Sequence, residues 1–327
     1  MKEMVGFTTT IPVEVVFAGG YVPCDLNNIF VSDDNPMQYL ERAEKDGFPK
    51  SMCNWVKGIY GVVVKKGIET VITVMEGDCS NTQALAEILR YKGIRTIPFS
   101  YPFDRDRHVL EREIDKLMSA FSVNPDRLAE VDKEIEEVRS TLALLDRMTW
   151  SDRLVTGHEN HLWLVRASDM LGDYREYNVM AKRFIDGVKD RAEIGGIRIG
   201  CIGVPPIVPD LHDFIGSVGG HVVYNETQRQ FALPYPSMNL VDRYLMYTYP
   251  YGIFARLEDI RREIRERRIQ GIIHYVQAFC HRVIEDVILR ETLGVPVISI
   301  EGDLPKALDA RTKLRIEAFM ELLGERE

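Results

Sequence analysis

The sequence predicts an α/β protein made of two doubly wound, Rossmann-like (flavodoxin-like) domains with a helical insertion between them. Short apolar runs alternate with helical patterns near both ends of the chain, which is typical of parallel sheets covered by helices. The middle has long, charged helical segments with few breakers. We therefore expect an N-terminal α/β domain over 1–122, a helical hairpin or linker over 123–195, and a C-terminal α/β domain with a terminal helix over 196–327.

Length and composition indicate a globular protein with two ordinary cores. The chain has 327 residues, of which 45% are hydrophobic and 28% charged. Its net charge of −9 argues against a surface for nucleic acid or anionic membranes. We find no apolar run of membrane-spanning length and no signal-peptide pattern, so we expect a cytoplasmic location. The five cysteines are widely scattered and are expected to be reduced.

The N-terminal domain alternates helices with short extended runs. Gly67 and Gly93 follow two of the helical patterns, as C-terminal capping glycines do. The expected elements are a helix over 12–18, an extended run over 21–24, a helix over 54–65, a strand over 70–75, a helix over 82–92 and a strand over 95–102.

The remaining segments are a charged helical middle and a second α/β unit. Apolar spacing predicts helices over 125–148 and 159–192. The second unit opens with the strand IRIGCIG, and DLHDFIGSVGGHVVYNE continues it as helix, glycine stop and strand. A charged helix then ends at Gly271, and IIHYVQAFCHRVIEDVILRETLGVPVISIE reads as strand, helix, a stop at Gly294 and strand. The last helix is expected over 310–323.

Three cysteines share one local context, the entry to a helix. Cys79 follows an apolar strand and opens a helix in the N-terminal domain, and Cys280 does the same in the C-terminal domain. Cys53 precedes another helix. Helix N-termini stabilise thiolates, and ligands of such folds bind at the carboxyl ends of the strands. A metal ligand, a cluster ligand or a nucleophile fits this placement, and a buried structural thiol is the alternative for each cysteine alone.

The other two cysteines, and the wide spacing of the first three, limit the kinds of metal or thiol site that the chain could form. Cys201 lies inside a strand and is expected in the core, and core packing is also favoured for Cys24. Zinc sites usually take four ligands in close local pairs, and thiol–disulfide enzymes also pair cysteines locally. Three separated cysteines suit an iron–sulfur cluster whose fourth iron accepts a non-protein ligand.

Several motifs in order resemble the 2-hydroxyacyl-CoA dehydratases and their relatives, the benzoyl-CoA reductases. GFTTTIPVEVVFAGGYVP is similar to the opening of that family, and SMCNWVKG and GDCSNT resemble its first two cluster-cysteine motifs. GIIHYVQAFCHRV resembles the region of the third cysteine, and GVPVISIEGDLPKALDARTKLRIEAFMELL resembles the family's ending. The resemblance covers most of the chain, which looks like a 2-hydroxyglutaryl-CoA dehydratase D-component-like subunit.

The resemblance implies a subunit of a lyase that carries out radical, anaerobic chemistry on an acyl-CoA thioester. Cys53, Cys79 and Cys280 would hold a 4Fe-4S cluster, with a related second subunit or a second copy of the chain as partner. An ATP-dependent iron–sulfur activator would supply one electron. The thioester carbonyl would become a ketyl radical anion, and water would leave the neighbouring carbon.

The resemblance also indicates candidate catalytic residues. Thr8, Thr9 and Thr10 lie where the family has a hydroxyl-bearing turn, so one of them could hydrogen-bond the substrate, and helix capping before Pro12 is the equal alternative. His281 could tune the cluster or act as an acid, and a surface histidine is the favoured alternative.

Other residues receive structural or open assignments. Glu14, His274 and Asp303 are expected to be structural. Arg105, Arg107 and Lys306 follow predicted strands, but the sequence does not assign them to CoA phosphates.

Two other functional classes stay open. One is a non-catalytic or electron-transfer cluster subunit, with a benzoyl-CoA reductase-like subunit as a variant of the enzyme class. The other is a zinc or metal-free binding module on the same fold. Neither the GxGxxG pattern nor the Walker pattern occurs, so we expect no ATP or NAD site on this chain.

Overall fold

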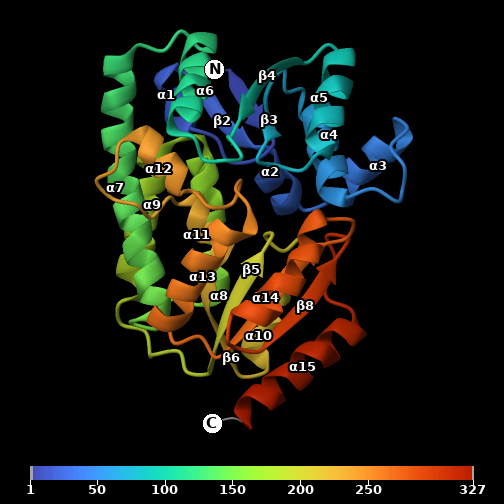
Figure 1. Ribbon diagram of the computed structural model, residues 1–327, viewed down its shortest axis with the longest axis vertical. Coiled ribbons are helices and arrows are strands. Elements are labelled where there is room, and N and C mark those ends of the chain that lie inside the picture. Colours follow the sequence, from blue (N-terminus) through green and yellow to red (C-terminus); the bar gives the residue numbers. More distant parts are fainter. Residues whose placement is uncertain (1–2, 326–327) are drawn as a thin grey trace. The chain divides into compact units, whose positions relative to one another are not determined.

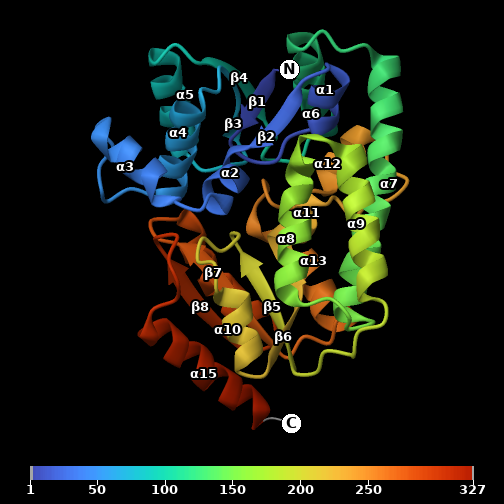
Figure 2. The same cartoon turned by 180° about the vertical axis from the view of Figure 1, so that it is seen from behind.

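The computed structural model describes residues 3–325, which divide into two compact units (Figures 1 and 2). Of these residues, unit 1 comprises 3–140, 166–179 and 233–252. Unit 2 comprises 141–165, 180–232 and 253–325. Each unit is described by itself below.

Unit 1 contains a four-stranded parallel sheet in the order β2-β1-β3-β4. Phe7 of the central strand β1 pairs with Asp25 on one side and Ile72 on the other. Strand β3 is buried over its first five residues, as expected for a parallel sheet covered on both faces. The strands are β1 (Met4–Phe7), β2 (Val22–Asp25), β3 (Thr70–Glu76) and β4 (Arg95–Ser100).

Helices pack closely against this sheet and against each other. A Cβ atom at Gly58 of α4 would overlap Phe30 of α2, and one at Gly61 would overlap the backbone of Tyr39 in α3, so these glycines permit close helix contacts. Figures 1 and 2 show α4 and α5 beside β3 and β4. The helices are α1 (Val13–Ala18), α2 (Leu26–Ser32), α3 (Met37–Lys45), α4 (Asn54–Lys66), α5 (Asn81–Tyr91), α6 (Arg107–Ala120), η1 (Arg166–Ser168), η2 (Met170–Gly172) and α12 (Leu240–Met246).

Unit 2 repeats this sheet topology, with the order β6-β5-β7-β8 and parallel pairing throughout. All seven residues of β7 and all six of β6 are buried. The strands are β5 (Ile197–Gly203), β6 (Gly220–Asn225), β7 (Gly271–Gln277) and β8 (Val297–Gly302).

Helices cover both faces of the unit 2 sheet. In Figure 1, α14 lies in front of the sheet, whereas α10 lies in front in the reverse view of Figure 2. Leu257 and Ile260 of α13 and Leu289 of α14 join Ile202 and Ile272 in one hydrophobic core. The helices are α8 (Gly157–Val165), α10 (Leu211–Ser217), α11 (Glu226–Phe231), α13 (Ile253–Glu266), η3 (His281–Glu285), α14 (Asp286–Thr292) and α15 (Ala310–Gly324).

Two helices contribute residues to both units. α7 (Pro125–Trp150) passes from unit 1 to unit 2 after Ser140, and α9 (Tyr174–Val188) does so after Val179. A helical insertion as a part of its own is therefore not confirmed, and the predicted domain boundaries stay a prediction. Among residues 3–325, no helix is both long enough and apolar enough to cross a membrane.

The α/β class and most of the expected elements are confirmed, and three expectations need correction. The sequence interpretation lacked the central strand β1 and the helices α2, α3, α6, α11 and α12. The helix expected over 159–192 is broken, because η1, η2 and a left-handed Leu171 separate α8 from α9. The helix expected after Cys280 begins as the 3-10 turn η3. Gly67, Gly93 and Gly294 have positive φ after their helices, as expected of capping glycines.

Candidate active site

The topology places a ligand-binding edge in each unit. Both sheets reverse their strand order beside their first strand, so the switch points lie between β1 and β3 in unit 1 and between β5 and β7 in unit 2. Ligands of doubly wound folds bind at this point, outside the carboxyl ends of the strands. Cys79 follows Glu76, the last residue of β3, and Cys280 follows Gln277, the last residue of β7, at the same spacing. The two cysteines therefore occupy equivalent positions in the two units.

Each of the three candidate cysteines lies at the entry to a helix. Cys53 is the N-cap residue of α4, a helix of 13 residues. Cys79 directly precedes Ser80, the N-cap of α5, and its carbonyl accepts a hydrogen bond from the Thr82 amide at 2.9 Å. Cys280 is the N-cap of η3, which continues into α14. Amide groups and the helix dipole at such positions favour the thiolate form, which is the form that binds metals.

The two remaining cysteines lie within strands rather than at helix entries, and like Cys53 they are buried. Cys24 lies in β2 and Cys201 in β5, and both are free thiols. Burial, together with the charges of Asp169 and Asp25, raises the pKa of Cys24 to about 12. Burial alone raises the pKa of Cys201 to about 12. Both thiols stay protonated near neutral pH, which makes them poor ligands.

A turn that we call the threonine turn, Thr8, Thr9 and Thr10, follows β1 at the switch point of unit 1. All three side chains are buried. The Thr8 amide donates to the Ile72 carbonyl at 3.2 Å, and the Thr8 hydroxyl accepts from the Val74 amide at 3.1 Å. The Tyr101 hydroxyl donates to the Thr10 carbonyl at 2.8 Å. The turn is thus bonded directly to strand β3, which leads to Cys79.

The threonine hydroxyls do not cap α1. The N-cap of α1 is Pro12, and no side chain caps this helix. Instead, Thr9 and Thr10 lie beside the phenol of Tyr247, and their hydroxyls act to lower its pKa. Burial raises the pKa of Tyr247 well above its ordinary value, so the phenol remains a proton donor.

Tyr247 connects the threonine turn with the turn that carries Cys79. The charge of Asp78, the residue before Cys79, also raises the pKa of Tyr247. The rings of Tyr101 and Tyr247 meet edge to face at 5.7 Å, and a Cβ atom at Gly77 would press on Tyr101 and Pro250. The sequence interpretation did not include these tyrosines, although the tyrosine-rich stretch RYLMYTYPYG was a signal for them.

Glu14 of α1 is a buried carboxylate a few residues after the threonine turn. Its carboxylate pairs with Arg139 and accepts from the Tyr244 hydroxyl at 3.0 Å. Burial raises the pKa of Glu14, but the charges of Arg139 and Arg243 outweigh it and hold the pKa below its usual value. The Tyr244 hydroxyl also donates to the Ile11 carbonyl at 2.9 Å, so this cluster holds the start of α1.

In unit 2, a buried charge network holds the turn that carries Cys280. Arg256 donates to both oxygens of Glu226 at 2.7 and 2.8 Å, and it also pairs with Glu285 of η3. Glu226 in turn accepts from the Gly203 amide at the end of β5 at 2.8 Å. Arg256 therefore joins the end of β5 to the 3-10 turn that Cys280 begins.

The two histidines near Cys280 differ in exposure. His281 is exposed, and desolvation and the charge of Arg282 lower its pKa. His274 is fully buried in β7, and its Nδ1 lies 2.7 Å from Asp286. Desolvation lowers the pKa of His274 as well. These contacts agree with the structural assignment expected for His274.

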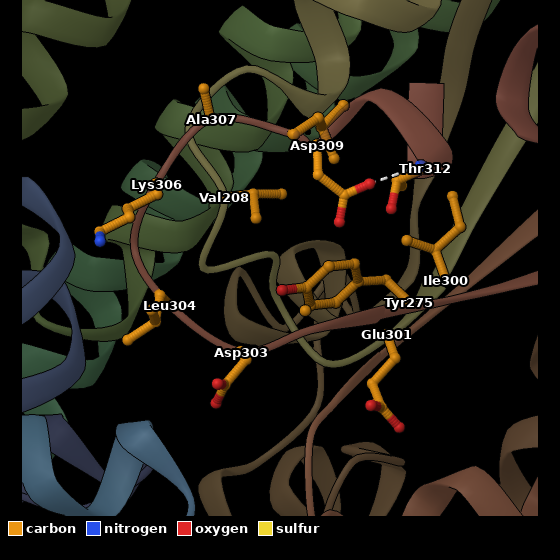
Figure 3. A pocket seen from close by; sticks show the side chains of 12 residues that line it. Val208, Tyr275, Ile300, Glu301, Asp303, Leu304, Lys306, Ala307, Asp309 and Thr312 are labelled. Atoms are coloured by element: carbon orange, nitrogen blue, oxygen red, sulfur yellow. Dashed lines mark hydrogen bonds between the residues drawn. The ribbon is translucent and has the colours of Figure 1, made fainter. Parts of the chain in front are cut away.

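A cavity of about 280 Å³ lies at the carboxyl end of β8. Figure 3 shows the Tyr275 ring in the middle of this pocket, with the carboxylates of Glu301, Asp303 and Asp309 around it. Lys306 also lines the pocket, so acidic groups outnumber basic ones and the lining does not favour an anion such as phosphate.

The two arginines near the end of β4 have partners within unit 1. Arg105 lies over the ring of Tyr251, and Arg107 pairs with Asp242 at 2.9 Å. The structure therefore provides no specific support for a CoA-phosphate role of either side chain.

Within residues 3–325, no three histidine, cysteine or acidic side chains lie close enough together to hold a metal ion. Unit 1 carries Cys53 and Cys79, and unit 2 carries Cys280. Within unit 1, the structure does bring the threonine turn and the Cys79 turn to the same tyrosine.

These features define a class: an α/β protein with two doubly wound sheets, each with a cysteine following the third strand at its switch point. A family model for the 2-hydroxyglutaryl-CoA dehydratase D-component matches residues 8–323. The chain therefore belongs to this family, and membership implies a dehydratase-like subunit of the lyase class. No curated protein matches the chain.

Proposed function

We propose that this chain is the iron–sulfur subunit of a 2-hydroxyacyl-CoA dehydratase-like enzyme, and that Cys53, Cys79 and Cys280 hold its 4Fe-4S cluster. The observation that carries the proposal is the division of the five thiols. Three lie at helix entries that favour the thiolate, and two lie in strands where the pKa is about 12. Three such thiolates would hold the cluster and would leave room for one ligand that the protein does not supply.

The donor chemistry of the chain fits such a group. Thiolate sulfur is the ligand that iron–sulfur clusters use, and the family is known for this cofactor. When bound, the cluster supplies one-electron chemistry for activation of the thioester. A partner subunit and an ATP-dependent activator that delivers the electron belong to this proposal.

The residues of unit 1 would bind and orient the substrate at the switch point. The hydroxyls of Thr9 and Thr10 and the phenol of Tyr247 form a group of neutral hydrogen-bond donors beside the Cys79 turn. Neutral, buried donors stabilise an oxyanion or a leaving hydroxyl more strongly than donors in water do. We propose that this group binds the thioester oxygen or the 2-hydroxyl of the acyl-CoA.

Metal analysis of five matched variants tests the cluster assignment. The protein and its Cys53→Ala, Cys79→Ala, Cys280→Ala, Cys24→Ala and Cys201→Ala variants are purified without oxygen and analysed for iron and sulfide. We expect about four of each per chain in the parent protein. The first three variants should lose much of both, whereas the two strand variants should keep them. Far-UV circular dichroism checks that every variant is folded.

Two outcomes would contradict the assignment. Zinc in place of iron would exclude the cluster. Equal iron content in the Cys79→Ala and Cys201→Ala variants would exclude the claim that the helix-entry cysteines are ligands and the strand cysteines are not. A change in the electron paramagnetic resonance spectrum on addition of a 2-hydroxyacyl-CoA supports substrate binding at the cluster. A spectrum that no acyl-CoA alters would instead indicate an electron-transfer subunit.

A further inference from the structure

A second polar group in unit 1 lies at the carboxyl end of β2 and contains two buried carboxylates. Asp25 is the last residue of β2, and Asp169 precedes η2 from a distant part of the chain. The two residues are 2% and 6% exposed. The Asp25 amide donates to Asp169 Oδ2 at 2.9 Å, so η2 is bonded directly to the end of the strand.

The donors around both carboxylates are neutral. Asp25 accepts from the amide and the side chain of Asn27, each at 2.9 Å, and from the Ser168 hydroxyl. Asp169 accepts from the Leu171 amide at 3.0 Å and from the Asn28 side chain. Two negative charges buried among neutral donors repel each other, so one of them favours protonation. Burial and the charge of Asp25 accordingly raise the pKa of Asp169 to about 7, and burial raises that of Asp25.

One side chain links this pair to the threonine turn. The Asn27 side-chain nitrogen donates both to Asp25 Oδ1 and to the Thr8 carbonyl, each at 2.9 Å. Phe7, which precedes Thr8, pairs with Asp25 in the sheet. The orientation of Asn27, and through it the Thr8 carbonyl, therefore depends on the position of Asp25.

We propose that Asp25 and Asp169 are positioning residues for the threonine turn, and that they hold one proton between them at neutral pH. With the proton in place, the pair carries a single charge and η2 stays bonded to β2. Loss of the proton leaves two like charges beside each other. Their repulsion weakens the contact between η2 and the end of β2, and with it the hydrogen bond that holds the Asn27 side chain against Asp25. This inference rests on the proposed function in one respect: the proposed function supplies the substrate that the threonine turn would bind.

The other ionisable groups around the pair keep their charge state near neutral pH. Cys24 of β2 has a pKa of about 12, and burial with the charge of Asp169 raises the pKa of Tyr177 in α9 far above neutrality. Arg166 of η1, whose charge acts on Tyr177, stays protonated at all these pH values. Helix α2 contributes only the amides of Asn27 and Asn28 to the pair. A titration observed here near neutral pH therefore belongs to the aspartates.

Carbon-13 NMR of the protein labelled at the aspartate carboxyl carbons tests the proton directly. We expect one aspartate resonance to titrate near pH 7, far from the usual range of this side chain, and to vanish in Asp169→Asn. The matched control is Asp173→Asn, because Asp173 is an exposed carboxylate at the other end of η2. This control should keep the titration. If no aspartate of the parent protein titrates between about pH 6 and 8, the proposal is overturned.

Hydrogen exchange tests the positioning role. Exchange in a peptide covering residues 4–12, corrected for the intrinsic effect of pH, should be faster at about pH 8 than at about pH 6. In Asp169→Asn, whose side chain is uncharged at both pH values and keeps an oxygen that can accept from the Asp25 amide, we expect equal protection at both pH values. Asp25→Asn provides a second variant with the same expected result. A pH effect that survives in both variants would overturn the role of the pair.

Neither measurement depends on a cluster, so failure of this inference and failure of the proposed function are distinguishable. If the three cysteines bind iron but no aspartate titrates near neutral pH, the proposed function stands and the positioning role of Asp25 and Asp169 is rejected. A titrating pair in a protein that binds no iron would do the reverse.

Discussion

The buried pair predicts how the stability of the protein changes with pH. In the folded protein Asp169 has a pKa of about 7, against 3.8 for the ordinary side chain. Between about pH 4 and pH 7, the folded state therefore keeps a proton that the unfolded chain releases. Because the folded state binds more protons in this window, the free energy of unfolding falls as the pH rises through it. Above about pH 7 the contribution stays constant, since both states are then ionised.

The size of the effect follows from the two pKa values. Each pKa unit corresponds to about 1.4 kcal/mol, so ionised Asp169 costs the folded state about 4 kcal/mol. The raised pKa of Asp25 acts in the same direction. Asp169 is 6% exposed, so solvent screens this cost only weakly. Replacement by asparagine removes the titrating group and keeps the shape of the side chain.

Urea unfolding of the parent protein and of Asp169→Asn over about pH 4 to 8 measures the effect, with circular dichroism and tryptophan fluorescence as probes. We expect the stability of the variant relative to the parent to rise by about 4 kcal/mol from the acidic to the alkaline end. Asp173→Asn should follow the parent. Parallel stability curves for Asp169→Asn and the parent protein would refute the reasoning.

Further predictions concern unit 2. Arg267 donates to the two carboxylate oxygens of the buried Asp146 at 2.5 and 3.0 Å. Arg267→Met removes this partner and leaves the Asp146 charge buried, so we expect the free energy of unfolding measured in urea to fall by about 3–5 kcal/mol. Adding Asp146→Asn should recover much of that loss, and no recovery would contradict the pairing. Gly203→Ala should lower stability by more than about 1 kcal/mol, because Gly203 has φ +98° and a Cβ atom would overlap the Tyr275 carbonyl. Gly216→Ala, in open space on α10, should instead be neutral or stabilising.

Local patterns in the sequence determined the class of fold and the candidate ligands. Alternating apolar and helical runs predicted the parallel α/β units, and capping glycines such as Gly67 and Gly93 predicted helix ends. The positions of Cys53, Cys79 and Cys280 at helix entries were also predictable. Capping and strand ends depend on residues close together in the chain, so a linear pattern contains this information.

Only the tertiary structure decided the central strand, the partners of the threonine turn and the proton-binding pair. Strand β1 has four residues, too few for a clear period, and it becomes central through its pairing with β2 and β3. Asp25 and Asp169 stand 144 positions apart in the sequence, so no local pattern shows that they meet. Their pKa values depend on burial and on a neighbouring charge. These are properties of the folded environment, which residue type and local spacing do not contain.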